Sequence, residues 1–357
     1  MKQPMRPLAK KLYLLAGSCV LSLFLLEVAS RFIRDPRKEP VVPTAVGRFD
    51  KDLGWALQPG ACAVSDRTGR RIEYKINSKG LRDNETPYKK PEGVYRIVLL
   101  GCSRTFGFGN PIEEHFSTLL ENYFDHVEVI NMGVSGYGID QYYLSLEKEG
   151  FKYEPDLVIA YVSHYGGFRH MKSKSSGRAK PYFEEEDGQL VLKNCSLSPP
   201  DWMPDKVGVP TEIHQWLRRH SCAYELLRDA IFALISPAAP AANISMYDDL
   251  SEESTSEEFL QANRLALLIA GAMNDACHKR HADFLLVTGV PALHESATAM
   301  KIPSLDVSAA QSNDRLALPD GLQHLNYAGN GVIAWEIARA LDERQLVSLK
   351  RRDHKKP

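Results

Sequence analysis

The sequence predicts an α/β fold in which helices cover a parallel sheet. Apolar runs at 95–100, 127–131, 157–162 and 284–290 are nearly continuous, which is typical of strands buried on both faces. Helical patterns lie between these runs, and strands that alternate with helices build a parallel sheet covered on both sides. The hydrophobic fraction of 44% and the charged fraction of 25% are those of an ordinary globular protein.

Helices and a last short strand complete the predicted domain. Asn326 is a good N-cap for the closing helix. The helices are expected at 116–124, 140–149, 256–281 and 326–341, and the short strand at 305–307. The segment 166–255 has little periodicity and several proline pairs, so we expect a long insertion there, with a helix near 213–235.

The first residues predict a membrane anchor. Residues 1–11 carry four basic side chains and no acid, and an apolar segment follows at 12–32, interrupted by Glu27 and Arg31. That segment is long enough to span a bilayer, and the cationic start indicates a cytoplasmic N-terminus. A cleaved signal peptide is the alternative, because 28–30 offers small residues. Either way, the rest of the chain lies outside the cytoplasm.

The remaining parts follow from composition. Alternation at 71–76 and a turn at 77–80 predict a small hairpin in a Pro- and Gly-rich extension that packs on the main domain. In chain order the predicted parts are a cytoplasmic N-terminus 1–11, an anchor 12–32, the extension 33–93, the main domain 94–348 and a basic tail 349–357.

Charge and cysteine content narrow the class of function. A net charge of -1 argues against a nucleic-acid partner, which would need clustered basic residues. The six cysteines lack the spacing of metal ligands, and no phosphate-binding glycine motif opens a helix, so we expect neither a metal nor a cofactor. The sequence leaves open whether Cys62, Cys195, Cys222 and Cys277 form disulfides.

Residues that carry chemistry follow successive strands. Ser103, Gly133 and His164 come after the first, second and third strands, and Asp320 and His324 precede the last helix. In an open parallel sheet, ligands bind beyond the carboxyl ends of the strands. We therefore expect all five residues at one rim. A serine hydroxyl, an imidazole and a carboxylate together are the groups of a serine hydrolase.

Four segments, 101–107, 131–138, 160–165 and 320–326, resemble the SGNH (GDSL-like) hydrolase family in the family's own order. The likeness covers roughly 94–345, and the leader with the segments around Trp55 and Arg82 looks like bacterial, membrane-anchored members. The resemblance implies a three-layer α/β/α, flavodoxin-like fold. It implies Ser103 as nucleophile, His324 as base and Asp320 as its partner, with an oxyanion hole formed by Ser103, Gly133 and His164.

Three departures from the family pattern are informative. Cys102 stands where the family usually has Asp, and His164 where it has Asn. One extra residue separates Asp320 from His324. Cys102 is an alternative nucleophile, because thiolates attack acyl groups well.

The expected function is ester hydrolysis at a bacterial inner membrane, facing the periplasm or the exterior. The location suggests O-acyl groups of an envelope polysaccharide or lipid as substrate. Acyl transfer through the same site is one alternative. A non-catalytic scaffold or glycan-binding protein is the other.

Overall fold

The structure is a computed structural model of the whole chain. It describes residues 17–18, 20–30, 46–66, 68–165, 168–175, 178–198, 256–320 and 323–344, with isolated positions between 213 and 227. The chain divides into two compact units, Met1–Glu39 with Pro199–Asn243, and Pro40–Ser198 with Ile244–Pro357. The second unit holds the sheet and every predicted site residue.

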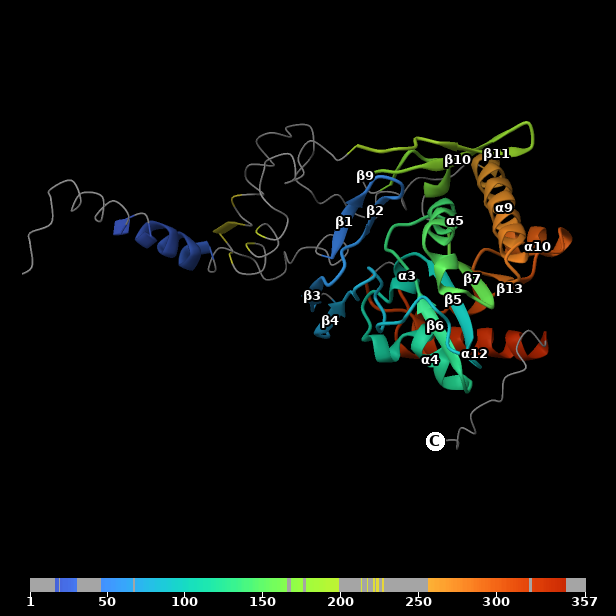
Figure 1. Ribbon diagram of the computed structural model, residues 1–357, viewed down its shortest axis with the longest axis horizontal. Coiled ribbons are helices and arrows are strands. Elements are labelled where there is room, and N and C mark those ends of the chain that lie inside the picture. Colours follow the sequence, from blue (N-terminus) through green and yellow to red (C-terminus); the bar gives the residue numbers. More distant parts are fainter. Residues whose placement is uncertain are drawn as a thin grey trace, which may run out of the picture. The chain divides into compact units, whose positions relative to one another are not determined.

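A five-stranded, fully parallel sheet forms the centre of this unit, as the sequence predicts (Figure 1). The strand order β13-β12-β7-β5-β6 is the flavodoxin-like order, in which the strands that follow β5 in the chain lie on both sides of it, β6 on one side and β7 on the other. The strands are β5 Tyr95–Gly101, β6 Val127–Asn131, β7 Leu157–Val162, β12 Asp283–Thr288 and β13 Ser304–Asp306.

The helices form one layer on each face of the sheet (Figure 1). Successive strand residues point to opposite faces. Val98 and Leu100 accordingly pack with α5 Ile139–Lys148, α9 Ser256–His278 and α10 Pro291–Ala299. Ile97 and Leu99 pack with α4 Phe116–Tyr123 and α12 Tyr327–Glu343. This is the predicted three-layer α/β/α arrangement.

Differences from the predicted elements concern their ends and one helix. The strand predicted to reach 290 ends at Thr288, and the unexpected α10 begins at Pro291, whose fixed φ suits the first helical position. Asn326 caps α12 as predicted, its Oδ1 accepting from Gly329 N at 2.9 Å. The short helices are α3 Ser103–Phe106, η2 Ile112–Glu114, η3 Gly150–Tyr153, η4 Arg169–Met171, α11 Ser308–Gln311 and η6 Asp314–Leu316.

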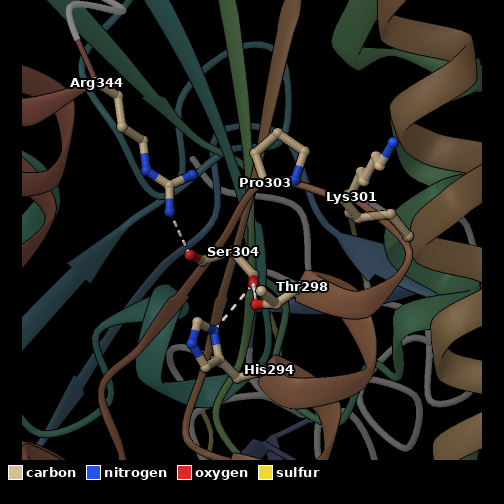
Figure 2. A pocket seen from close by; sticks show the side chains of 7 residues that line it. His294, Thr298, Lys301, Pro303, Ser304 and Arg344 are labelled. Carbon is tan, nitrogen blue, oxygen red and sulfur yellow. Dashed lines mark hydrogen bonds between the residues drawn. The ribbon is translucent and has the colours of Figure 1, made fainter.

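The outer edge of the sheet is protected at β13. Arg344 Nη2 donates to the Ser304 carbonyl at 2.5 Å, so one acceptor of this edge strand is occupied. Figure 2 shows this bond beside the contact of 2.9 Å between Ser304 Oγ and His294 Nδ1. An open pocket of about 500 Å³ lies here, and none of the predicted site residues lines it. An arginine along an edge strand hinders pairing with another chain.

The extension contains two hairpins where the sequence predicts one. The strand predicted at 71–76 is β4 Ile72–Lys75, but it pairs with the preceding strand β3 Cys62–Ser65, so the turn at 77–80 does not join the two strands of the hairpin. The second hairpin pairs β1 Gly47–Asp50 with β2 Gly54–Leu57. Trp55 on β2 is buried, and its Nε1 donates to the Ser135 carbonyl at 3.1 Å. The extension therefore shares the hydrophobic core of the main domain.

The described part of the insertion also forms hairpins. They are β8 Lys174–Ser175 with β9 Arg178–Ala179, and β10 Tyr182–Glu186 with β11 Gln189–Lys193. Lys180, between them, makes a fully buried ion pair with Asp140 on α5. This pair fixes the start of the insertion to the main domain. Most of the helix predicted near 213–235 lies outside the described residues.

Two predictions concern the compartment. Residues 20–30 are helical, but no helix within the described ranges has the length and apolar character needed to cross a bilayer. Much of the predicted anchor at 12–32 falls outside those ranges. Cys102, Cys195 and Cys277 are free thiols, so these three form no disulfide; Cys19 and Cys222 are not among the described residues.

Candidate active site

Ser103 lies where β5 turns into the short helix α3, at the carboxyl edge of the sheet. Its Oγ is 2.8 Å from His324 Nε2. The other ring nitrogen, Nδ1, is 2.5 Å from Asp320 Oδ2. The structure thus brings together the three predicted residues, and both distances lie within the range of proton transfer.

The extra residue between Asp320 and His324 does not separate the carboxylate from the ring. Gln323 takes a left-handed conformation with φ of 56°, and Leu318 N donates to the His324 carbonyl at 2.6 Å. His324 is 4% exposed, and its ring packs against Phe108 with 4.8 Å between ring centres. The imidazole is therefore held on three sides.

Gly133 differs from the expectation. Its amide, predicted to face an oxyanion, donates instead to Asn131 Oδ1 at 2.9 Å. A Cβ at this position would lie 2.3 Å from Phe106 N and 2.4 Å from the Thr105 carbonyl carbon. A glycine is required here because α3 crosses directly over it. In this structure Gly133 makes room for the nucleophile turn rather than offering a free donor.

His164 follows β7, as predicted. Its Nδ1 is buried and has no hydrogen-bond partner among the described residues. Burial lowers the pKa of His164 well below its usual value, and the charges of Arg104 and Arg169 add to this effect. The ring is therefore neutral, with one N–H to donate and no fixed partner at Nδ1.

Cys102 lies beneath the nucleophile turn rather than beside the base. Its sulfur is buried, 3.6 Å from Ser163 Oγ. Burial by itself would raise the pKa of this thiol, but the Arg169 charge, the Arg104 amide and the Ser163 hydroxyl outweigh it and lower the pKa. The bond from His324 Nε2 goes to Ser103, so the geometry favours the hydroxyl as nucleophile.

Sequence reasoning missed the role of the extension at this site. Arg82 is 2% exposed and donates to the carbonyls of Phe106, Gly107 and Asn110 at 2.8, 2.5 and 2.6 Å. Its guanidinium also lies 4.3 Å from the centre of the Tyr74 ring. These carbonyls end α3 and continue the turn, so Arg82 fixes the nucleophile segment from behind. The sequence offered only the likeness of the surrounding segment to membrane-anchored family members.

Asp83, the next residue of the extension, fixes the segment 131–138 that contains Gly133. Its Oδ2 accepts from Asn131 N at 2.7 Å, and Asn131 in turn binds the Gly133 amide. Burial raises the pKa of Asp83 to about 7, although its bonds from Asn131 N and Asn84 N lower it in part.

The free energy of unfolding is expected to depend on pH because of the Asp83 carboxyl group. Its pKa is higher in the folded than in the unfolded chain, so ionising it costs stability in full above pH 7. The cost shrinks as the pH falls below 7 and is gone only near the ordinary carboxyl pKa of 3.8. From pH 8 to pH 6 we expect Asp83 to add about 1.4 kcal/mol to the free energy of unfolding. Urea unfolding of the wild type and Asp83→Asn at both pH values measures this.

The difference in pH dependence between the wild type and Asp83→Asn gives the contribution of Asp83 alone. Burial holds the pKa values of His115, His164 and His170 below their usual range, so these rings act with the opposite sign, but they do so in both proteins. The same pH dependence in wild type and Asp83→Asn would refute the assignment.

In the described parts of the chain, no group of three or more His, Cys, Asp or Glu side chains is arranged to hold a metal ion.

Comparisons with known proteins give solved structures only. No family model and no curated protein matches the sequence. A lipase/acylhydrolase from Enterococcus faecalis is 15% identical with a TM-score of 0.39, over 73% of this chain and 100% of its own. A GDSL-like lipase from Bacteroides thetaiotaomicron is 11% identical with a TM-score of 0.36, over 72% and 92%.

A two-domain esterase active on acetylated mannans is 16% identical with a TM-score of 0.36, over 74% of this chain and 52% of its own. The Bacteroides thetaiotaomicron lipase carries the name of the family that the sequence resembles. Likenesses at these scores carry no argument about activity. The function is therefore argued from the site itself.

Proposed function

We propose that the protein is a serine ester hydrolase of the SGNH type. One observation carries the proposal: Ser103 Oγ, the His324 ring and Asp320 Oδ2 form a continuous chain of contacts of 2.8 and 2.5 Å. An activated serine needs a base within hydrogen-bond reach and a third group that orients the base. Burial of His324 strengthens both contacts by excluding water.

In the proposed reaction, Ser103 Oγ attacks the acyl carbon while His324 Nε2 takes its proton. Asp320 stabilises the charged ring. The intermediate collapses when His324 returns the proton to the leaving alkoxide, which leaves an acyl-serine. Water, deprotonated by His324, then releases the acid and restores the serine. The oxyanion is assigned to the Ser103 amide and the His164 N–H.

Turnover of p-nitrophenyl acetate by the full chain tests this proposal. Labelling with a fluorophosphonate probe identifies the nucleophile: we expect it to persist in Cys102→Ala and to disappear in Ser103→Ala. Labelling that survives Ser103→Ala would make the thiol the nucleophile. The occupied Gly133 amide favours the second candidate, a non-catalytic glycan-binding protein. Absence of turnover and of labelling, together with binding to an acylated glycan, would support that candidate.

Loss of the His164 donor is expected to slow the reaction. We expect His164→Ala to lower kcat for p-nitrophenyl acetate about 10²- to 10³-fold, which is the usual effect of removing one oxyanion donor. His164→Asn keeps an N–H donor at this position and should retain most of the activity. An unchanged kcat in His164→Ala would show that the ring has no part in the oxyanion hole.

The substrate and the location are proposed with the activity. In the helical residues 20–30, six apolar side chains each expose more than half of their surface: Val20, Leu21, Leu23, Phe24, Leu25 and Leu26. An apolar surface of this extent is typical of a segment that a membrane covers. An anchored enzyme would meet O-acyl groups of envelope glycans or lipids, and hydrolysis or transfer of the acyl group would differ only in the final acceptor. Release of the protein from membranes by a salt wash would contradict the anchor.

A further inference from the structure

Arg104, the residue after the nucleophile, connects the serine turn to the histidine loop. It is 4% exposed. Its Nε donates to the Gln323 carbonyl at 2.9 Å, and its Nη1 donates to Gln311 Oε1 at 3.0 Å. No carboxylate within the described ranges forms an ion pair with it. An arginine buried at the site and bonded to a carbonyl and an amide serves geometry rather than charge neutralisation.

The carbonyl that Arg104 holds belongs to the residue directly before the base. Gln323 has a φ of 56°, a conformation that costs a residue with a Cβ about 1–2 kcal/mol. Such a conformation persists only where its surroundings fix it. Gln323 lies in the segment that carries one residue more between Asp320 and His324 than the family that the sequence resembles. The bond from Arg104 supplies that fixation.

The other end of Arg104 is itself rigid. Gln311 Nε2 donates to the Tyr161 hydroxyl at 2.6 Å, and Tyr161 is fully buried on β7. The amide of Gln311 also fills the space over Gly289, where a Cβ would lie 2.0 Å from Oε1. Gln311 therefore has little freedom to turn, and the guanidinium is held in one place.

We propose that Arg104 is a positioning residue that keeps His324 aligned with Ser103 in spite of the longer loop; this rests on the proposed function. Ser103 and Arg104 are neighbours on α3, and Gln323 and His324 are neighbours in the loop. The bond of 2.9 Å between Arg104 and Gln323 therefore runs beside the contact of 2.8 Å between Ser103 Oγ and His324 Nε2. A displacement of about 1 Å in such a pair can cost about 10²-fold in rate.

Two readouts test the proposal in the full chain. The proton NMR signal of His324 Nδ1–H, shifted far downfield by its short bond to Asp320, reports the alignment of the ring even if no ester is hydrolysed. The second readout is kcat for p-nitrophenyl acetate. In Arg104→Met we expect the signal to move or broaden and kcat to fall about 10- to 100-fold, with KM within about twofold of the wild type. Arg104→Lys should be intermediate.

Matched variants separate alignment from general damage. Arg339→Met removes a partly exposed arginine of α12 that is ion-paired with Glu336, and it should change neither readout. Gln323→Gly relieves the left-handed strain and should restore part of the activity lost in Arg104→Lys. That rescue keeps the test decisive if Arg104→Met does not fold.

Two results would overturn the positioning role of Arg104. A folded Arg104→Met or Arg104→Lys with an unchanged signal and kcat within twofold would overturn the proposal. So would a loss in Arg104→Lys that Gln323→Gly does not reduce. If the wild type has no esterase activity but its signal responds to Arg104→Met, the proposed function fails and the positioning role stands.

Discussion

Replacing Ser103 by alanine is expected to lower kcat for p-nitrophenyl acetate by about 10⁶-fold, because removal of the nucleophile from a serine–histidine–aspartate site leaves only binding and oxyanion stabilisation. The Oγ is the atom that His324 Nε2 contacts at 2.8 Å, and no other hydroxyl contacts the ring within the described residues. Substrate binding should change little. Steady-state kinetics on an activated ester measure both quantities.

A matched control for this prediction is Ser163→Ala. That hydroxyl is also buried at the carboxyl edge of the sheet, but it contacts the Cys102 sulfur rather than the histidine. We expect its kcat to stay within about tenfold of the wild type. Equal losses in the two variants would indicate a structural disturbance of the rim, and retained activity in Ser103→Ala would exclude the proposed mechanism.

The sheet could be predicted from the sequence because its strands are buried on both faces. The bounds 127–131 and 157–162 are those of β6 and β7, since an uninterrupted apolar run has few other stable placements. Helix α10 was missed because the apolar Val290 lies only two positions beyond the end of the strand and was assigned to it. Gly289 marks the end of the strand there, and Pro291 marks the start of the helix.

The site could be predicted in part, for a different reason. Ser103 was found because strand ends in a parallel sheet converge, which depends only on topology. Asp320 and His324 were found as an acid and a histidine just before the closing helix. The state of the Gly133 amide was not predictable, because a side-chain conformation of Asn131 decides it. Arg82 and Arg104 were missed because they bind backbone carbonyls, and a carbonyl leaves no mark in the sequence. The carbonyl bound by Arg104 is 219 positions away.

Loss of Arg82 is expected to be among the most destabilising single changes in the chain. Arg82→Met would keep most of the side-chain volume but leave the carbonyls of Phe106, Gly107 and Asn110 without their donor. Each buried acceptor left without a partner costs about 1–3 kcal/mol. We therefore expect the free energy of unfolding to fall by about 3–5 kcal/mol, a size that marks a broken buried network. Urea unfolding of the full chain gives this value.

Arg70→Met is the control within the same extension, because Arg70 makes an exposed ion pair with Glu114 and should cost less than about 1 kcal/mol. If the two variants unfold at the same urea concentration, the extension merely lies against the domain and the bonds of Arg82 contribute little. If Arg82→Met is the weaker protein and also loses esterase activity under conditions where it remains folded, the extension is part of the catalytic scaffold. Because the three carbonyls belong to the nucleophile turn, we expect that second result.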